Sequence, residues 1–204
     1  MSEFKYVNPV NVGWLENRLD SNELNYVWER IRNCSDESWK PTLAGDIFSS
    51  KRLEDPDDWF FNNVILKCGE TYQHLYYNLG EHLPIPEGNY PYYMKDWWVN
   101  YQHQGDFNPI HHHTGVYSFV IWLKIPVEHA EQNKDNASNM KLRSAFQFTY
   151  VDILGSLKDY TYQLDKSWEG TMLFFPSNLH HQVYPFYNCD EDRITVSGNI
   201  LCKI

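Results

Sequence analysis

The feature that most constrains the fold is a change in hydrophobic periodicity near residue 95. Before this point, apolar residues recur every three to four positions, as on one face of a helix. After it, five runs rich in β-branched and aromatic residues read as strands: DWWVNYQHQ, GVYSFVIWLKIP, SAFQFTYVDI, GTMLFFP and RITVSGNILCKI. Because the strands follow the helices and do not alternate with them, we expect an α+β chain whose core is an antiparallel sandwich or barrel.

Two helices are expected in the first third of the chain. The first begins after Asp20, which can cap it with Glu23 as the capping-box partner. The second begins at Asp55, with Pro56 in the first helical position, and continues to about residue 79. A proline-rich segment, 83–93, then leads into the strands. We therefore expect a helical support region at 1–94 that braces a β-rich core at 95–204.

Length and charge narrow the class of protein. A chain of 204 residues is long enough for one sizeable core, so we expect a single domain. The formal charge of −10 opposes binding to nucleic acid or to an anionic membrane. The sequence shows neither a leader-like N-terminus nor a membrane-spanning run, and its four scattered cysteines suit free thiols, so a cytoplasmic protein is expected.

One segment differs from its surroundings. Residues 127–144 are polar, lack periodicity and interrupt two strong strands. Such a segment is either a disordered surface loop or a mobile lid over a site near the strand ends. The two interpretations are compatible, and the sequence favours neither.

The histidines are clustered. Five of the nine occupy two short segments, FNPIHHHTGVYSF and FFPSNLHHQVYPF. Along a strand side chains alternate between faces, so His111 and His113 point to one side and His112 to the other. Two imidazoles on one face, with a third from a distant strand, can bind a non-haem iron and leave coordination positions open.

These segments resemble a known family. GDFNPIHHHTGVYSFVIWLKIP, GTMLFFPSNLHHQVYPF and DRITVSGNI follow the patterns F-N-P-x-H-x-H, F-P-x-x-L-x-H-x-V-x-P and R-x-[ST]-x-x-x-N, in that order. They are similar to the iron(II)- and 2-oxoglutarate-dependent oxygenases, in particular the small, prolyl-hydroxylase-like branch often encoded by bacteriophages. The resemblance implies a double-stranded β-helix (jelly roll, cupin-like) with N-terminal helices bracing the major sheet. If the chain is phage-encoded, its place of action is the host cytoplasm.

The resemblance also implies a ligand set. His111 takes the first metal-ligand place, His113 the second and His181 the third, since Leu179 and Val183 frame His181 and not His180. Most of the wider superfamily has a carboxylate at the second place. A three-histidine cupin-type iron dioxygenase that does not use 2-oxoglutarate is therefore an alternative. Asp106 could in principle supply the carboxylate, but it precedes the turn before His111.

The strand that begins at Arg193 is expected to carry part of the cosubstrate pocket. Arg193 can bind the far carboxylate of 2-oxoglutarate bidentately, and alternation places Thr195 and Ser197 on the same face. A polar strand face of this kind is equally consistent with plain exposure to solvent. Three more pocket residues are expected from their positions near the histidines. Gln102 stands where related enzymes carry a cosubstrate-binding tyrosine, and Asn100 is its neighbour on the same strand face. Tyr117 is an even number of residues from His111 and His113, so alternation along a strand would place it on their side.

The function implied is that of a hydroxylase using Fe(II), 2-oxoglutarate and O2, with release of succinate and CO2. The substrate is expected to be a small molecule or a protein side chain, neutral or cationic. A non-enzymatic β-sandwich module whose histidines hold zinc is the alternative from another class of protein. The sequence does not determine the substrate, the type of oxidation or the oligomeric state.

Overall fold

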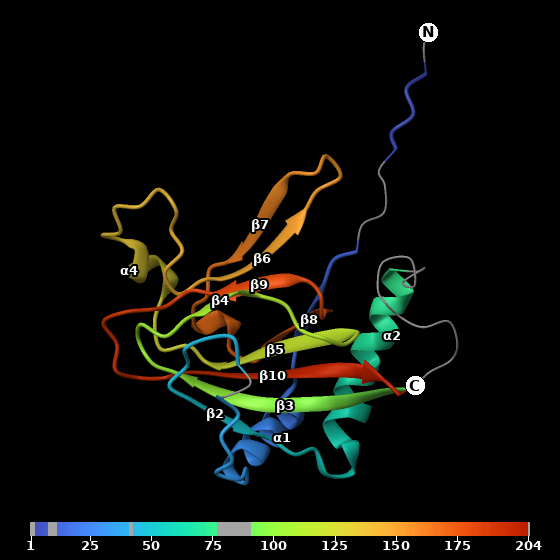
Figure 1. The fold of residues 1–204 in the computed structure, drawn as a ribbon, viewed down its shortest axis with the longest axis vertical. Coiled ribbons are helices and arrows are strands. Elements are labelled where there is room, and N and C mark those ends of the chain that lie inside the picture. The colour runs from blue at the N-terminus through green and yellow to red at the C-terminus, as the bar shows by residue number, and fades with distance from the viewer. Residues whose placement is uncertain (1–2, 8–11, 41–42, 77–90, 204) are drawn as a thin grey trace.

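Two antiparallel sheets form the body of the protein. The computed structural model describes residues 3–7, 12–40, 43–76 and 91–203 (Figure 1). The larger sheet has the strand order β1-β8-β5-β10-β3-β2, and the smaller sheet has the order β4-β9-β6-β7. The strands are β1 (Leu15–Arg18), β2 (Ser49–Arg52), β3 (Tyr92–Gln102), β4 (Asn108–His111), β5 (Tyr117–Lys124), β6 (Phe146–Val151), β7 (Leu157–Tyr162), β8 (Thr171–Pro176), β9 (His180–Val183) and β10 (Arg193–Cys202).

The larger sheet is covered on both faces. Its inner face meets the smaller sheet through an apolar cluster that includes Val120, Trp122, Phe146, Phe148 and Phe175. Its outer face packs on the helices α1 (Ser21–Arg32) and α2 (Leu66–Leu75), as Figure 1 shows. This arrangement confirms the expected α+β class, with helices bracing the major sheet.

The first helix begins as its sequence predicts. The Asp20 side chain accepts hydrogen bonds from the backbone N–H groups of Asn22 and Glu23, and the Glu23 carboxylate accepts one from the N–H of Asp20. Both halves of a capping box are therefore present. The face that includes Val27 and Ile31 is buried against the sheet.

The second helix starts later than expected. Pro56–Asp58 form a separate 3₁₀ turn, and Asp57 and Asp58 have φ values of 60° and 51°, which no continuous helix allows. A π-helical turn, Phe61–Ile65, leads into α2. The Asp55 carboxylate accepts hydrogen bonds from the N–H groups of Phe60 and Phe61 at 2.9 Å, and thereby caps the start of the helical residues that lead into α2. The expected end of the helix near 79 falls in 77–90, outside the described residues, as does most of the 83–93 segment.

The first third is not only helical. Strands β1 and β2 add to opposite edges of the larger sheet, β1 against β8 and β2 against β3. Each has four residues, which is too short for a period of two to stand out from its surroundings.

The 127–144 segment has a defined structure, which contradicts one of its two interpretations, the disordered loop. It contains the short helix α4 (His129–Asn133). The Asn133 side-chain amide donates to the carbonyls of His129 and Arg143, which closes the segment on itself. Its last residue, Ser144, donates its N–H to the carbonyl of Pro185 at 2.8 Å.

Two further sequence expectations concern thiols and membranes. Cys34, Cys68, Cys189 and Cys202 are all free, as expected. Within the described ranges, no helix combines the length and the apolar character needed to cross a bilayer.

Replacing Asp55 tests the start of the second helix. Asp55→Asn removes the charge that accepts from Phe60 and Phe61 and from the Tyr26 hydroxyl. We expect it to lower the free energy of unfolding by about 1–2 kcal/mol in urea denaturation, the usual cost of a lost helix cap. Asp57→Asn is the matched control, because Asp57 is exposed, and we expect it to change stability by less than about 0.5 kcal/mol. Equal effects of the two variants would contradict the capping role.

Candidate functional site

Three histidines converge between the sheets. His111 ends β4 and is the register partner of His181 on β9. His113 follows β4, and its N–H donates to the carbonyl of Ser177 at 2.8 Å, which ties it to the end of β8. The ligand atoms of the three side chains all lie within 4.8 Å of one another. The pairing of β4 with β9 thus joins residues that are seventy positions apart in the sequence.

Backbone hydrogen bonds orient two of the rings. Nδ1 of His111 lies 2.7 Å from the carbonyl of Pro109, and Nδ1 of His181 lies 2.9 Å from the carbonyl of Leu179. A carbonyl only accepts, so Nδ1 carries the proton and Nε2 keeps a free lone pair. This is the arrangement by which proteins fix the tautomer and direction of metal-binding imidazoles.

The three rings are neutral at physiological pH. Burial lowers the pKa of all three rings from the ordinary value of 6.5. The pKa of His113 falls to about 4, that of His181 falls well below 6.5, and that of His111 is also lowered. The neighbouring histidines add to the effect. His181 is 5% exposed and lies against the rings of Phe146 and Phe175. Neutral imidazole is the form that binds metal ions, so the donor set fits a divalent transition metal.

The other two histidines of the two segments turn outward. His112 and His180 are exposed, and their ring centroids lie 5.0 Å apart. His112 therefore points away from the converging nitrogens, as expected, although it lies just past the end of β4.

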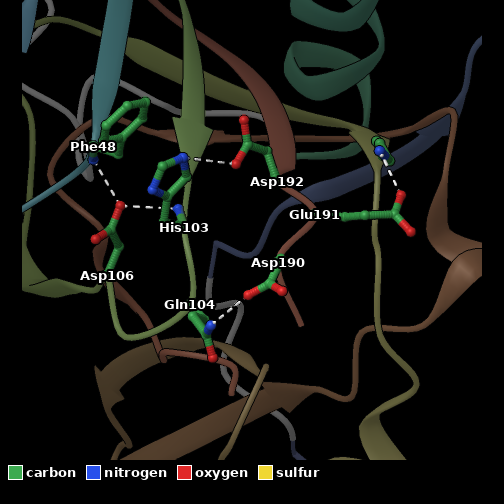
Figure 2. Close-up of polar contacts among 8 residues, drawn as sticks. Phe48, His103, Gln104, Asp106, Asp190, Glu191 and Asp192 are labelled. Atoms are coloured by element: carbon green, nitrogen blue, oxygen red, sulfur yellow. Dashed lines mark hydrogen bonds and ion pairs between the residues drawn. The ribbon is translucent and has the colours of Figure 1, made fainter. Parts of the chain in front are cut away.

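Asp106 serves a different purpose. Figure 2 shows its carboxylate between the backbone nitrogens of Phe48 and His103, from which it accepts hydrogen bonds of 2.6 and 3.0 Å. The His103 ring stacks on Phe48 and pairs with Asp192 at 3.0 Å. Asp106 thus holds the turn before β4. Within the described part of the chain, the convergent cluster contains three imidazoles and no carboxylate.

A cavity of about 330 Å³ opens beside the three histidines. Four of the six expected cosubstrate residues line it: Asn100, Gln102, Thr195 and Ser197. They come from β3 and β10, which pair in the register Thr195 to Asn100. Their polar face is therefore turned into the cavity and not to bulk solvent.

Arg193 is a buried cation without an acidic partner among the described residues. It is 0% exposed, and its guanidinium donates to Ser144 Oγ at 2.9 Å and to Gln102 Oε1 and the Tyr184 carbonyl at 3.4 Å each. Its Nε has no partner in the described structure. Burial lowers the pKa of Arg193 to about 9, which leaves it charged at neutral pH. It touches the cavity lining through Gln102. A charge buried in this way favours an anionic ligand.

The expectation for Tyr117 is wrong. Its ring packs on Tyr72 of α2 and on Phe174, at centroid distances of 5.2 and 4.8 Å, on the helix side of the larger sheet. Residues 112–116 are not in a strand, and Gly115 has a φ of 125°. Because this turn interrupts the strand, the alternation of side chains between the two faces cannot be counted from His111 as far as Tyr117.

Several cavity residues were not expected. Trp98 and Trp122 are buried core residues, as the sequence indicates, and both also line the cavity. Trp98 alternates with Asn100, a signal that could have placed it there. Asp96 and Asn108 also line the cavity; Asn108 lies within the F-N-P-x-H-x-H pattern, but the spacing alone gives it no role. Trp39 lies outside any strand and carries no signal.

A family model for 2OG-Fe(II) oxygenases matches residues 96–199, about half of the chain. No curated protein matches. Among solved structures, similarity is found to a 2OG-Fe(II) oxygenase family oxidoreductase from Burkholderia pseudomallei, with a TM-score of 0.55, 12% identity and coverage of 89% of this chain and 79% of that one.

Two prolyl hydroxylases are also similar. The prolyl-4-hydroxylase of Pseudomonas putida has a TM-score of 0.50 and 14% identity, covering 94% of each chain. The Trichoplax adhaerens prolyl hydroxylase, solved with a hypoxia inducible factor peptide, has a TM-score of 0.51 and 13% identity, covering 93% of this chain and 83% of that one. At these identities the structural similarity establishes a shared fold, the double-stranded β-helix.

The chain belongs to the 2OG-Fe(II) oxygenase family. It is accordingly an oxidoreductase, a dioxygenase that uses Fe(II), 2-oxoglutarate and O2. The two alternatives left open by the sequence, a cupin-type enzyme without 2-oxoglutarate and a non-enzymatic zinc module, are not supported by this membership.

The buried histidines predict a pH dependence of stability in the metal-free protein. Their pKa values are lower in the folded state than the unfolded value of about 6.5, so below pH 6.5 the unfolded state binds more protons. Stability should therefore fall as the pH decreases from 6.5 toward 4, by at most about 1.4 kcal/mol per pH unit for each histidine that stays neutral in the folded state.

Urea unfolding of the metal-free protein between pH 7.5 and 4.5 measures this effect. His113→Asn should reduce the slope, whereas His112→Asn, at the exposed neighbouring position, should leave it unchanged. The same slope in wild type and His113→Asn would show that the fold does not bury His113 in its neutral form.

Proposed function

We propose that His111, His113 and His181 hold the iron and that Arg193 binds the far carboxylate of 2-oxoglutarate. One observation supports this proposal above the others. Three neutral imidazoles line the cavity together with Gln102, which accepts a hydrogen bond from a buried guanidinium that has no acidic partner among the described residues. A dianionic ligand that chelates a metal at one end and needs a cation at the other satisfies both.

The proposed reaction is hydroxylation of a C–H bond. For a substrate R–H, the balance is R–H + O2 + 2-oxoglutarate giving R–OH + succinate + CO2, with one oxygen atom entering each of the first two products. Bound iron and 2-oxoglutarate supply the oxidising chemistry, and the protein supplies binding, orientation and a dry environment.

The ligand set itself favours an anionic cosubstrate. Three neutral histidines leave the charge of Fe(II) uncompensated, whereas a carboxylate at the second place would remove part of it. The metal therefore attracts the keto-acid end of the cosubstrate more strongly than it would with a carboxylate ligand. A low local dielectric increases this attraction further. Burial of His181 among Phe146, Phe148 and Phe175 provides that dry environment.

Polar side chains on β3 and β10 complete the cosubstrate site in this proposal. The Gln102 amide is fixed at both ends, because its Nε2 donates to the Asp106 carbonyl at 2.7 Å and its Oε1 accepts from Arg193. The Asn100 Oδ1 is buried and has no partner in the described structure. Together with the hydroxyls of Thr195 and Ser197, these groups would bind and orient the cosubstrate in the cavity.

The substrate is proposed to be a small molecule or a protein side chain. Two structural neighbours are prolyl hydroxylases, one of them solved with a peptide. The formal charge of −10 opposes a nucleic-acid substrate. Four free thiols favour a reducing compartment such as the cytoplasm as the place of action.

Anaerobic spectroscopy tests the metal ligands. Wild-type protein with Fe(II) should gain a visible charge-transfer band on addition of 2-oxoglutarate, and under air it should form succinate. His181→Ala should lose the band and the succinate, because one of three ligands is missing. His180→Ala, at the adjacent exposed position, should retain both. A wild-type protein that binds Fe(II) but gives neither band nor succinate would refute the proposed function.

Arg193→Lys tests the cosubstrate site. Lysine keeps the charge but loses the planar fork, so we expect the 2-oxoglutarate concentration at half-maximal band intensity to rise by about 10- to 100-fold. The affinity for Fe(II) alone should stay the same. Arg143→Lys is the matched control, because Arg143 lies over the Tyr187 ring as Arg193 lies over Phe186, at 5.4 and 5.0 Å from the ring centroids. A similar shift in both variants would remove Arg193 from the cosubstrate site.

A further inference from the structure

We propose that the end of the cavity opposite Arg193 binds a cationic group of the substrate, an amine or guanidinium on an aliphatic chain. Asp96 is its counter-ion, and Trp98 and Trp39 form its aromatic wall. This inference rests on the proposed function, because it assigns the substrate class of the same site. Four observations support it.

The first is the position of Asp96 along β3. Every second residue of β3 from 96 to 102 lies on the same face of the strand, and all four of these residues line the cavity: Asp96, Trp98, Asn100 and Gln102. Gln102 contacts Arg193 at one end, and Asp96 lies three two-residue steps away, about 20 Å along the strand. The Trp98 ring lies 6.1 Å from that of His113. His113 therefore lies beside the part of β3 that runs from Asp96 to Gln102.

The second is the charge of the lining. Apart from the histidines, Asp96 is the one ionisable residue among the described side chains that line the cavity. No described side chain forms a hydrogen bond or ion pair with its carboxylate, and the residue is half-buried. Its register partner Asn199 accepts a hydrogen bond from the Ser118 hydroxyl at 2.8 Å. An unpaired carboxylate beside an apolar wall favours a cation over a neutral group.

The third is the aromatic wall. The rings of Trp39 and Trp98 are stacked, with centroids 6.1 Å apart and planes 24° apart. The guanidinium of Arg52 already lies 5.6 Å from the centroid of Trp39. Indole faces attract amines and guanidinium groups, most strongly where water is excluded, and Trp98 is 4% exposed.

The fourth is distance. Asp96 and Trp98 are two residues apart on one strand face, which corresponds to about 7 Å. The four-carbon stem of a lysine side chain spans a similar distance. A cation held at Asp96 would therefore place the aliphatic carbons of its chain near Trp98 and His113, where oxidation takes place. The net charge of −10 adds a long-range attraction for such a ligand.

Calorimetric titration of the anaerobic protein, loaded with Fe(II) and 2-oxoglutarate, tests the inference. The probes are N-acetyl-lysine amide, N-acetyl-norleucine amide, which lacks the charge, and free lysine. We expect both lysine probes to bind at least tenfold more tightly than the norleucine probe. Preference for the blocked amide indicates a peptide side chain, and preference for free lysine indicates a small amine; either result supports a cation site.

Asp96→Asn should abolish the preference for charge while keeping the charge-transfer band and the affinity for 2-oxoglutarate. Asp190→Asn, at an exposed acid in the turn shown in Figure 2, should keep the preference. Equal binding of charged and neutral probes, or an unchanged ratio in Asp96→Asn, would overturn the inference. The two proposals fail separately: a band without preference for charge rejects only the cation site, and preference without a band rejects only the oxygenase site.

Discussion

The register of β10 between β3 and β5 is the constraint on which the rest of the structure depends. One face of β10 contributes Val196 and Ile200 to the apolar cluster under the helices. Because side chains alternate along the strand, those on the opposite face of β10 point between the two sheets. A shift by one residue would bury the polar face under the helices and place isoleucine and valine in the cavity. Helix packing on one side of the sheet therefore holds the site on the other side in place.

The cavity has an electrostatic direction. A buried guanidinium lies behind Gln102 at one end of the cavity and the Asp96 carboxylate lies at the other, and neutral imidazoles also line the cavity. Neither charge has an oppositely charged partner among the described residues, so each favours a ligand group of the opposite sign. In the proposed site, an anionic cosubstrate and a cationic substrate would bind at opposite ends of the cavity and would not compete for one subsite.

Much of this site could be predicted from the sequence where strand alternation applies. His111, Thr195, Ser197 and Asn100 lie where a period of two places them. Alternation failed at Tyr117, because five residues outside any strand intervene and Gly115 adopts a left-handed φ. The local sequence pattern also could not predict contacts between residues that are far apart in the chain. Ser144 reaches Arg193 from a polar segment without periodicity, and Trp39 joins the cavity wall from a loop. Strands of four residues, such as β1 and β2, are too short to be recognised before their partners are known.

The carboxylate of Asp106 joins two parts of the protein that would otherwise be independent. It accepts from the backbone of Phe48 and of His103, and a β-bridge pairs Asp46 with Phe107 beside it. Ile47 belongs to the cavity wall, and Phe107 leads into the strand that ends at His111. The cavity wall and the strand that carries His111, a proposed metal ligand, therefore share one anchor. In an enzyme with a different substrate, remodelling this wall would require compensating changes at the anchor to keep the imidazole in place, which limits how freely this part of the pocket can diverge.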